Sequence, residues 1–255
     1  MTIAQSADTS WLSLDGARVL VAGAGGIGGE CVAGYVGAGA RVLVTDRDQE
    51  RLDALAAAHP GVETLACDLT EPGAGTAVVD QAVSRLGGLD VLLHCVGIND
   101  RRPVLEFTEA EWDRVMRVNL TSAFGISQAA GRHLVTQGSG RIVMLSSVSG
   151  LLAHAHHGPY ATSKGGMNQM MRVMAREWAA SGVTVNAVAP GYVETNLTAA
   201  HLDKPGVREG LTSLVPAGRL GRPGEVVGPV LFLSSPHAAF VTGHVLYIDG
   251  GRTLV

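Results

Sequence analysis

The chain has few charged residues and no concentration of positive charge. Only 16% of its 255 residues are Asp, Glu, Lys or Arg, against ~25% in an average soluble domain. So small a charged fraction predicts that part of the surface is buried against other subunits. A net charge of −4 without a basic cluster argues against nucleic acid as a partner.

Cysteines are also scarce, and no apolar run is long. Cys31, Cys67 and Cys95 are odd in number and lack C-x-x-C spacing, which favours neither a disulfide framework nor a zinc site. We therefore expect that the protein binds no metal and lies in the reducing cytoplasm. The start of the chain lacks the basic and apolar stretches of a signal peptide. Polar residues interrupt every apolar run before the ~18 residues that a membrane span needs, so we expect a soluble protein without membrane contact.

The length fits a single large domain, because cores keep growing up to ~250 residues before chains split. Residues 1–14 are expected to form an N-terminal tail, of which Met1 to Ser10 are small and polar. Residues 15–255 are then expected to form a single domain.

Short β-rich apolar runs alternate with longer stretches of helical period, as in β-α-β units with a parallel sheet. The fold class predicted is α/β: one Rossmann-type, doubly wound sheet of seven parallel strands with helices on both faces. Strands are expected at Arg18–Ala22, Arg41–Thr45, Val62–Ala66, Val91–His94, Arg141–Leu145, Val183–Val188 and Val245–Ile248. Helices are expected at Ile27–Gly39, Gln49–His59, Gly73–Leu86, Glu109–Gln137, Tyr160–Ser181 and Pro223–Leu233.

The most informative motif is Tyr160-Ala-Thr-Ser-Lys164, with Ser147 upstream. On a helix, positions four apart lie on one face with Cβ atoms ~6 Å apart, so phenol and ammonium share one pocket wall. A Lys charge ~4 Å away at an effective dielectric of ~20 is worth ~4 kcal/mol, which would lower a phenol pKa of ~10 by ~3. We therefore expect Tyr160 to titrate near the working pH, as acid–base catalysis requires. Taken alone, the pair also fits an amphipathic helix with a solvated Lys.

A glycine-rich turn follows the first predicted strand. It contains Gly23, Gly25, Gly26, Ile27 and Gly28 in the pattern G-x-G-x-x-G. The missing side chains let backbone amides and a helix N-terminus approach a pyrophosphate, whose charge the helix dipole favours. The strand-turn-helix context favours dinucleotide binding over an ordinary tight turn.

Acidic residues follow the second and third strands. Asp46 stands where a carboxylate accepts hydrogen bonds from the adenosine ribose and repels a 2′-phosphate, which favours NAD over NADP. Arg47 is the counterargument, because an Arg there accommodates that phosphate. Asp68, with Leu69, is placed either to border the adenine or to cap a helical turn.

Together these residues resemble the short-chain dehydrogenase/reductase family in its compact single-domain form, over nearly the whole chain. Further matching segments are Val118-Asn119, Ser146-Ser147, Pro190-Gly191-Tyr192-Val193-Glu194-Thr195 and Asp249-Gly250-Gly251. The resemblance implies an NAD(P)-dependent oxidoreductase that interconverts a secondary alcohol and a ketone by hydride transfer, and a homotetramer. It also implies coenzyme contacts from Cys95, Gly97, Tyr160, Lys164, Pro190, Gly191, Val193 and Thr195, besides the glycine turn and the acids above.

The family's catalytic tetrad is carried here by Asn119, Ser147, Tyr160 and Lys164. By resemblance, Ser147 bonds the substrate oxygen and Tyr160 exchanges the proton. Lys164 lowers the Tyr pKa and holds the nicotinamide ribose, while Asn119 supports a water that links Lys164 to solvent. Without the family, Asn119 would be a helix-interior polar residue and Ser147 a strand-end cap.

The chain departs from the family pattern in two places. Ala22 replaces the usual Thr at a first turn that is one residue shorter, and His94-Cys95-Val96-Gly97 replaces Asn-Asn-Ala-Gly. Both changes remove side-chain hydrogen bonds at the sheet edge. We expect lost rigidity or altered coenzyme affinity there, with the chemistry retained.

The substrate is indicated only by the loops. Residues 97–103, Leu105 to Phe107 and Trp112 are similar to the sugar-acid branch of the family, which includes gluconate 5-dehydrogenase and 2-deoxy-gluconate 3-dehydrogenase. Arg101 and Arg102 would bind a carboxylate as a fork, or stay in solvent or at a subunit contact. The loop histidines between Ser147 and Tyr160 would border the substrate, and residues 196–215 would form a lid.

Three alternatives remain open from the sequence. A 3-oxoacyl carrier-protein reductase should prefer NADPH and need a basic docking patch, which the sequence does not show. A secondary-alcohol dehydrogenase of broad specificity would use the same tetrad. A non-catalytic dinucleotide-sensing scaffold would share the fold, because fold alone does not fix function.

Overall fold

One parallel sheet of seven strands forms the centre of the molecule, in the order β3-β2-β1-β4-β5-β6-β7. The computed structural model describes residues 10–255, so residues 1–9 of the predicted tail lie outside the described part. The predicted α/β fold with seven parallel strands is confirmed. The strands are β1 Arg18–Ala22, β2 Arg41–Asp46, β3 Glu63–Ala66, β4 Val91–His94, β5 Gly140–Leu145, β6 Val183–Pro190 and β7 Val245–Ile248.

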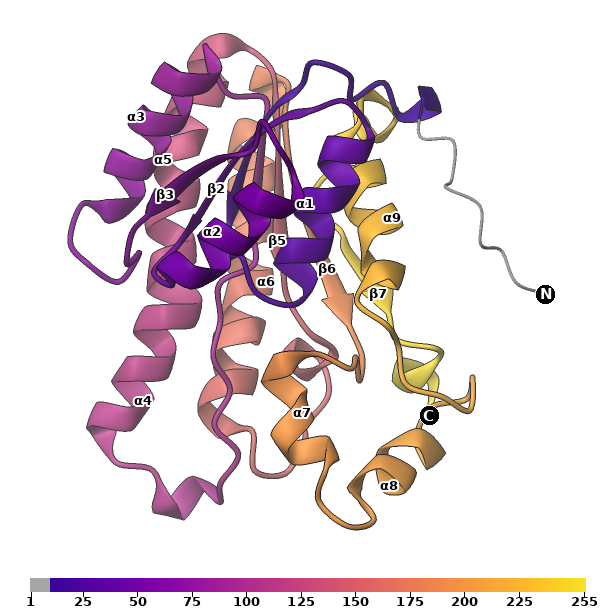
Figure 1. The fold of residues 1–255 in the computed structure, drawn as a ribbon. Helices are drawn as coiled ribbons and strands as arrows, with labels where there is room; N and C mark the ends of the chain where they lie inside the picture. The colour runs from indigo at the N-terminus through magenta and orange to yellow at the C-terminus, as the bar shows by residue number, and fades with distance from the viewer. Residues whose placement is uncertain (1–9) are drawn as a thin grey trace.

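Helices cover both faces of the sheet (Figure 1). On one face lie α1 (Ile27–Gly37), α2 (Gln49–Ala58) and α9 (Gly224–Ser234), which pack with Val19, Val21 and their strand neighbours into one apolar core. The other face carries α3 (Ala74–Leu86), α5 (Ser122–Gln137) and α6 (Gly158–Trp178), around a second core that includes Leu20 and Leu92. Successive β1 residues therefore point to opposite cores, as a strand buried on both faces requires.

The helix predicted over Glu109–Gln137 is interrupted. It consists of α4 (Glu109–Met116), a π-helical turn (Arg117–Thr121) and α5. Thr108 and Glu111 form a capping box that starts α4. The π-helical turn carries Asn119, whose side chain is fully buried. Such π-helical turns are rare in proteins, and those that occur often lie at functional sites. The spacing of apolar residues does not predict them.

Part of the predicted N-terminal tail is packed against the domain. Leu12 and Leu14, from the segment predicted as tail, are buried at 3% and 2% exposure in the core that contains α1.

The predicted lid, residues 196–215, contains α7 (Asn196–Leu202) and α8 (Val207–Ser213). Figure 1 shows both beyond the edge at which β6 ends. Among residues 10–255, no helix combines the length and apolar character that crossing a bilayer requires.

A glycine on α5 sets the spacing between α5 and α6, the helix that carries the Tyr-Lys pair. A Cβ added at Gly131 would lie 2.6 Å from the Trp178 indole, whereas one added at Gly125 on the same helix would meet nothing within 4 Å. We expect Gly131→Ala to lower the free energy of unfolding by ~1–3 kcal/mol through overpacking. Gly125→Ala should raise it by ~0.5–1 kcal/mol through helix propensity. Urea unfolding measures both, and equal effects of the two variants would contradict the packing argument.

Candidate active site

The predicted site residues converge at one edge of the sheet. Parallel strands present their carboxyl ends at the same edge, and the strand order reverses between β1 and β4. The glycine turn follows β1, and Cys95 and Gly97 follow β4. Open α/β sheets bind ligands in the crevice at such a reversal.

The glycine turn leaves room for a ligand on its outer side. Gly23 and Gly26 have φ values of +103° and +48°, which side chains disfavour. A Cβ at Gly28 would lie 2.0 Å from the carbonyl oxygen of Gly23, so only glycine fits there. Helix α1 starts at Ile27 without a side-chain cap, and its dipole favours an anion at that end. The turn therefore fits the pyrophosphate of a dinucleotide.

Asp46, at the end of β2, is fixed by the backbone around it. Its Oδ2 accepts a hydrogen bond from the amide of Ala24 at 2.8 Å, and its Oδ1 accepts one from the amide of Asp48 at 3.0 Å. Asp48 in turn pairs with Arg51 at 3.0 Å. A Cβ at Gly25 would lie 3.1 Å from the Arg51 guanidinium, so this cation borders the glycine turn, while Arg47 is exposed.

Asp68 is engaged in its own turn. Its Oδ1 accepts hydrogen bonds from the amide and the hydroxyl of Thr70, at 2.9 and 2.7 Å. These bonds hold the pKa of Asp68 below its usual range. Leu69 beside it is buried. The geometry is that of the capping turn, placed after β3 on the same edge of the sheet.

Asn119 ties the π-helical turn to the segment that follows β4. Its Oδ1 accepts from the amide of Ile98 at 2.8 Å, and its Nδ2 donates to the Ile98 carbonyl at 2.9 Å and to Ser163 Oγ at 3.0 Å. The side-chain amide of Asn119 thus bonds to both the N–H and the C=O of Ile98, as the backbone of a neighbouring strand would. Asn119 thereby joins α6 to the end of β4.

Lys164 is a buried cation beside Asn119. Its side chain is 3% exposed, and its Nζ donates to the carbonyl of Leu145 at 2.7 Å. A Cβ at Gly97 would lie 3.5 Å from Asn119 Oδ1 and 3.6 Å from Lys164 Nζ, so all three residues meet. Burial lowers the pKa of Lys164 to about 8. At neutral pH most of the population still carries the charge.

Tyr160 does not have the pKa expected from its Lys neighbour. Burial raises its pKa above the ordinary value, while a hydrogen bond with Ser147 and the charge of Arg101 act in the opposite direction. Lys164 Nζ lies 5.8 Å from the centre of the Tyr160 ring and is turned toward β5. The expectation that Lys164 lowers the pKa of Tyr160 toward neutrality is therefore wrong for the chain without coenzyme. The loss of hydration on burial raises the Tyr160 pKa by more than the Ser147 hydrogen bond and the Arg101 charge lower it.

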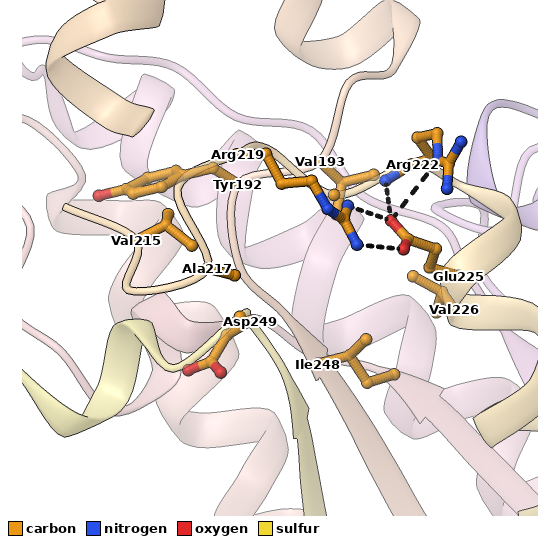
Figure 2. A pocket seen from close by; sticks show the side chains of 12 residues that line it. Tyr192, Val193, Val215, Ala217, Arg219, Arg222, Glu225, Val226, Ile248 and Asp249 are labelled. Atoms are coloured by element: carbon orange, nitrogen blue, oxygen red, sulfur yellow. Dashed lines mark hydrogen bonds and ion pairs between the residues drawn. The ribbon is translucent and has the colours of Figure 1, made fainter. Parts of the chain in front are cut away.

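The segment after β6 is fixed against the loop that starts α9. The amide of Glu194 donates to the Gly221 carbonyl at 3.0 Å, and the Gly221 amide donates to the Tyr192 carbonyl at 2.8 Å. Figure 2 shows Arg219 and Arg222 on either side of the Glu225 carboxylate, at the rim of a small cavity of about 100 Å³.

This support places Thr195 opposite the glycine turn. A Cβ at Gly26 would lie 3.4 Å from Thr195 Cβ, so residues distant in sequence face each other across the crevice. Val193 forms a bridge with Gly221 and is buried. Pro190 ends β6 and Gly191 follows it, packed against Asp249.

A larger cavity of about 430 Å³ opens beside Tyr160 and Ser147. It is lined from the loops after β4, β5 and β6, from α7 and α8, and from the end of the chain. Its basic lining residues are Arg101, His154, His156, His157, His201, Lys204 and Arg252. Of the residues described as lining it, none is Asp or Glu.

The two adjacent arginines do not act as a pair. Arg102 bonds to Asp100 and Glu111, at 2.9 and 2.8 Å, and stacks on the ring of Phe107. Arg101 instead lines the cavity, and its Nε donates to His157 Nε2 at 2.9 Å. The predicted fork of two arginines is therefore wrong. One of them remains available to a ligand.

The loop histidines form part of the cavity wall. His154 bonds with Ser149 Oγ at 2.9 Å and lies 3.4 Å from the Tyr192 hydroxyl. Burial and the charge of Arg101 lower the pKa of His157 to about 4, so this ring is neutral at neutral pH. Among the described residues, no group of His, Cys, Asp and Glu side chains is arranged to hold a metal ion.

Three basic cavity residues lie outside the predicted set. His201 and Lys204 come from α7 and the turn after it, within the segment expected to cover the substrate. The prediction that residues 196–215 cover the substrate was the sequence signal that could have identified His201 and Lys204. Arg252 follows Gly250 and Gly251 near the end of the chain, and no spacing in the sequence connects it with Tyr160.

The His94-Cys95 departure changes the floor of the site. His94 is fully buried, and burial lowers its pKa to about 3, so the ring is neutral. Its Nε2 lies 3.4 Å from Ser122 Oγ, which itself donates to the Val118 carbonyl at 2.6 Å. His94 thus contacts the end of the π-helical turn. Burial raises the pKa of the Cys95 thiol to about 12, which keeps it protonated.

Comparison with known proteins agrees with this geometry. A family model described as enoyl-(acyl carrier protein) reductase matches residues 21–253. Galactitol 2-dehydrogenase (L-tagatose-forming) of Cereibacter sphaeroides is 40% identical over 94% of this chain and 96% of its own. The 3-oxoacyl-[acyl-carrier-protein] reductase FabG of Vibrio cholerae serotype O1 is 37% identical, over 96% of this chain and 100% of its own.

Among solved structures, a gluconate 5-dehydrogenase from Burkholderia cenocepacia J2315 in complex with NADP and tartrate has a TM-score of 0.92. It is 34% identical and covers 97% of this chain and 99% of its own. Similarity of sequence and fold over almost the full length leads to one conclusion: the chain belongs to the short-chain dehydrogenase/reductase family and is an oxidoreductase.

Proposed function

We propose that the chain interconverts a secondary hydroxyl and a ketone on a sugar acid, with NAD as coenzyme. The observation that carries the proposal is a cavity lined by Tyr160 and Ser147 together with the cations Arg101, Lys204 and Arg252, with no carboxylate among the described residues of its lining.

The residues of the chain divide the work as follows. Ser147 and Tyr160 donate hydrogen bonds to the reacting oxygen, and Tyr160 gives or takes its proton. A phenol with a raised pKa is protonated at neutral pH, which prepares Tyr160 to act as the acid in ketone reduction. In alcohol oxidation, the hydrogen bond with Ser147 and the charge of Arg101 favour the phenolate that must form.

The coenzyme site is supported by the glycine turn, Asp46, Lys164 and Thr195. When bound, a nicotinamide dinucleotide supplies or accepts the hydride. Lys164 and Asn119 shape the inner end of the site beside Gly97, and the glycine turn shapes the pyrophosphate end.

NAD is favoured over NADP by the fixed position of Asp46. Its two oxygens are held by backbone amides, so the carboxylate stays in place when a nucleotide approaches. Arg51, the nearest cation to the glycine turn, is paired with Asp48. The Burkholderia enzyme is described in complex with NADP, so the preference requires a direct test.

A carboxylate-bearing substrate fits the cavity better than the alternatives. Burial removes hydration from Arg101, and within the described chain its side chain hydrogen-bonds to the neutral His157. An anionic ligand would restore the missing interaction. A fatty-acyl substrate would contact the apolar part of the lining, which includes Leu202, Leu211 and Leu214, but would leave the Arg101 guanidinium without an anionic partner. A neutral polyol would leave Arg101 without a counter-ion.

We also propose a homotetramer in the cytoplasm, without nucleic-acid or membrane partners. The low charged fraction supports an assembly. Phe124 on α5 and Val173 on α6 are large apolar residues with 45% and 48% exposure, as expected of side chains that a second copy covers.

Replacing the proposed proton donor tests the chemistry. Tyr160→Phe should lower kcat by ~10²–10⁴-fold, because general acid–base catalysis contributes that much. NADH affinity, measured by fluorescence titration, should stay nearly unchanged, because the hydroxyl alone is removed. A variant with near-normal kcat on sugar acids and polyols would remove Tyr160 from its role. Absence of turnover in the unaltered chain with every sugar acid and polyol would favour a dinucleotide sensor.

Coenzyme choice is tested at Asp46. A unit charge ~6 Å away at an effective dielectric of ~20 is worth about 3 kcal/mol, so Asp46→Ala should raise the NADP-to-NAD ratio of kcat/KM by ~10- to 100-fold. Asp53→Ala removes the same charge from an exposed site on α2 and serves as the control. An unchanged ratio in Asp46→Ala, or equal changes in both variants, would contradict the assignment.

Carboxylate recognition is tested by the two neighbouring arginines. Arg101→Gln should raise KM for aldonates by ~10- to 100-fold, because a hydrogen bond to a charged group is worth ~1.5–3 kcal/mol. The KM for neutral polyols should change little. Arg102→Gln, which removes a charge already paired with Asp100 and Glu111, is the matched control. Equal KM shifts for acids and polyols would argue against a carboxylate at Arg101.

A further inference from the structure

The cavity contains a second arginine whose charge the proposed mechanism does not use. Arg252 reaches the lining from the short helical turn Arg252–Leu254, and its Nη1 donates to the main-chain oxygen of Val255 at 2.8 Å. Its Nε is buried without a hydrogen-bond partner in the described structure. A buried N–H of a charged group without an acceptor is costly. An acceptor supplied by a ligand would remove this cost.

Within the part of the chain that the structure describes, Arg101 has no carboxylate partner, and the Arg252 guanidinium is bonded only to Val255, the last residue. The ion pairs of the remaining chain involve six other arginines: Arg18, Arg51, Arg102, Arg208, Arg219 and Arg222. Arg101 bonds to an imidazole. Arg252 bonds through Nη1 to an oxygen of the terminal residue Val255, while its buried Nε remains without an acceptor. Both side chains line the same cavity.

The two guanidinium groups have different imidazole neighbours in the cavity wall. Arg101 bonds to His157, whereas the charge of Arg252 acts on His154. The His154 and His157 rings meet edge to face with centroids 5.6 Å apart. Lys204 and His201 add basic groups from α7 and the turn after it. Each arginine thus has its own imidazole neighbour, which favours two separate positions for anionic groups.

We propose that the substrate pocket binds a linear polyhydroxy chain with an anionic group at each end, held by Arg101 and Arg252. The chemistry is shared by an aldarate, with two carboxylates, and by a phosphorylated aldonate. A cavity of about 430 Å³ lies within the usual range for small-molecule sites. The inference rests on the proposed function, because it extends the carboxylate site at Arg101 to a second subsite.

Achiral probes test the second subsite without dependence on sugar configuration. Butyrate, pentanoate and hexanoate are compared with succinate, glutarate and adipate by calorimetric titration of the full chain saturated with NADH. We expect at least one dicarboxylate to bind about tenfold or more tightly than the monocarboxylate of equal length. Arg252→Gln should abolish this advantage and leave monocarboxylate affinity unchanged. Arg102→Gln, with the same change of charge outside the cavity, should keep it.

Each outcome separates this inference from the proposed function. Equal affinities for both series at every length, or an advantage that survives Arg252→Gln, would overturn the second subsite while carboxylate binding at Arg101 stands. Monocarboxylate binding that Arg101→Gln does not weaken would overturn the carboxylate site itself. Among substrates, turnover of aldarates or of phosphorylated aldonates, each compared with the aldonate of the same configuration, identifies which second anion the pocket takes.

Discussion

Positive charge buried without a counter-ion is the constraint on which this site depends. Lys164 reaches from α6 to the end of β5, where a carbonyl oxygen is its partner, and Arg101 lines a cavity whose described lining has no carboxylate. Unneutralised buried cations are costly, and a fold keeps them only where the rest of the structure imposes the geometry. Here seven parallel strands end at one edge, so that the cations, the glycine turn and the Tyr160 hydroxyl share one crevice. The charge of Arg101 attracts an anion and also favours a phenolate at Tyr160.

Much of the fold follows from the sequence, because each strand is buried on both faces and reads as a short apolar run. The bounds of β1, β4 and β7 agree with the prediction, and the other strands differ by one or two residues at an end. The π-helical turn could not be predicted, because it depends on bonds from Asn119 to Ile98 and Ser163, which are distant in sequence. Local propensity contains no information on such contacts.

The site was predictable where a residue type has a fixed place at a strand end, and not where neighbouring side chains compete. Arg101 and Arg102 are identical in type and adjacent, yet Asp100, Glu111 and Phe107 bind only the second. The pKa of Tyr160 shows the same limit. A pairwise Coulomb argument gave the wrong direction because it left out the loss of hydration, which only the folded structure shows.

The central claim is that burial keeps the Tyr160 phenol protonated and that the Arg101 charge opposes this effect. Labelling the ring Cζ atoms of the four tyrosines with ¹³C gives a direct titration by NMR, with Tyr160→Phe to assign the signal. In the coenzyme-free protein we expect the Tyr160 pKa to lie above its ordinary value of ~10, and Arg101→Gln to raise it further. A Tyr160 pKa below that value, or one that Arg101→Gln leaves unchanged, would contradict the account.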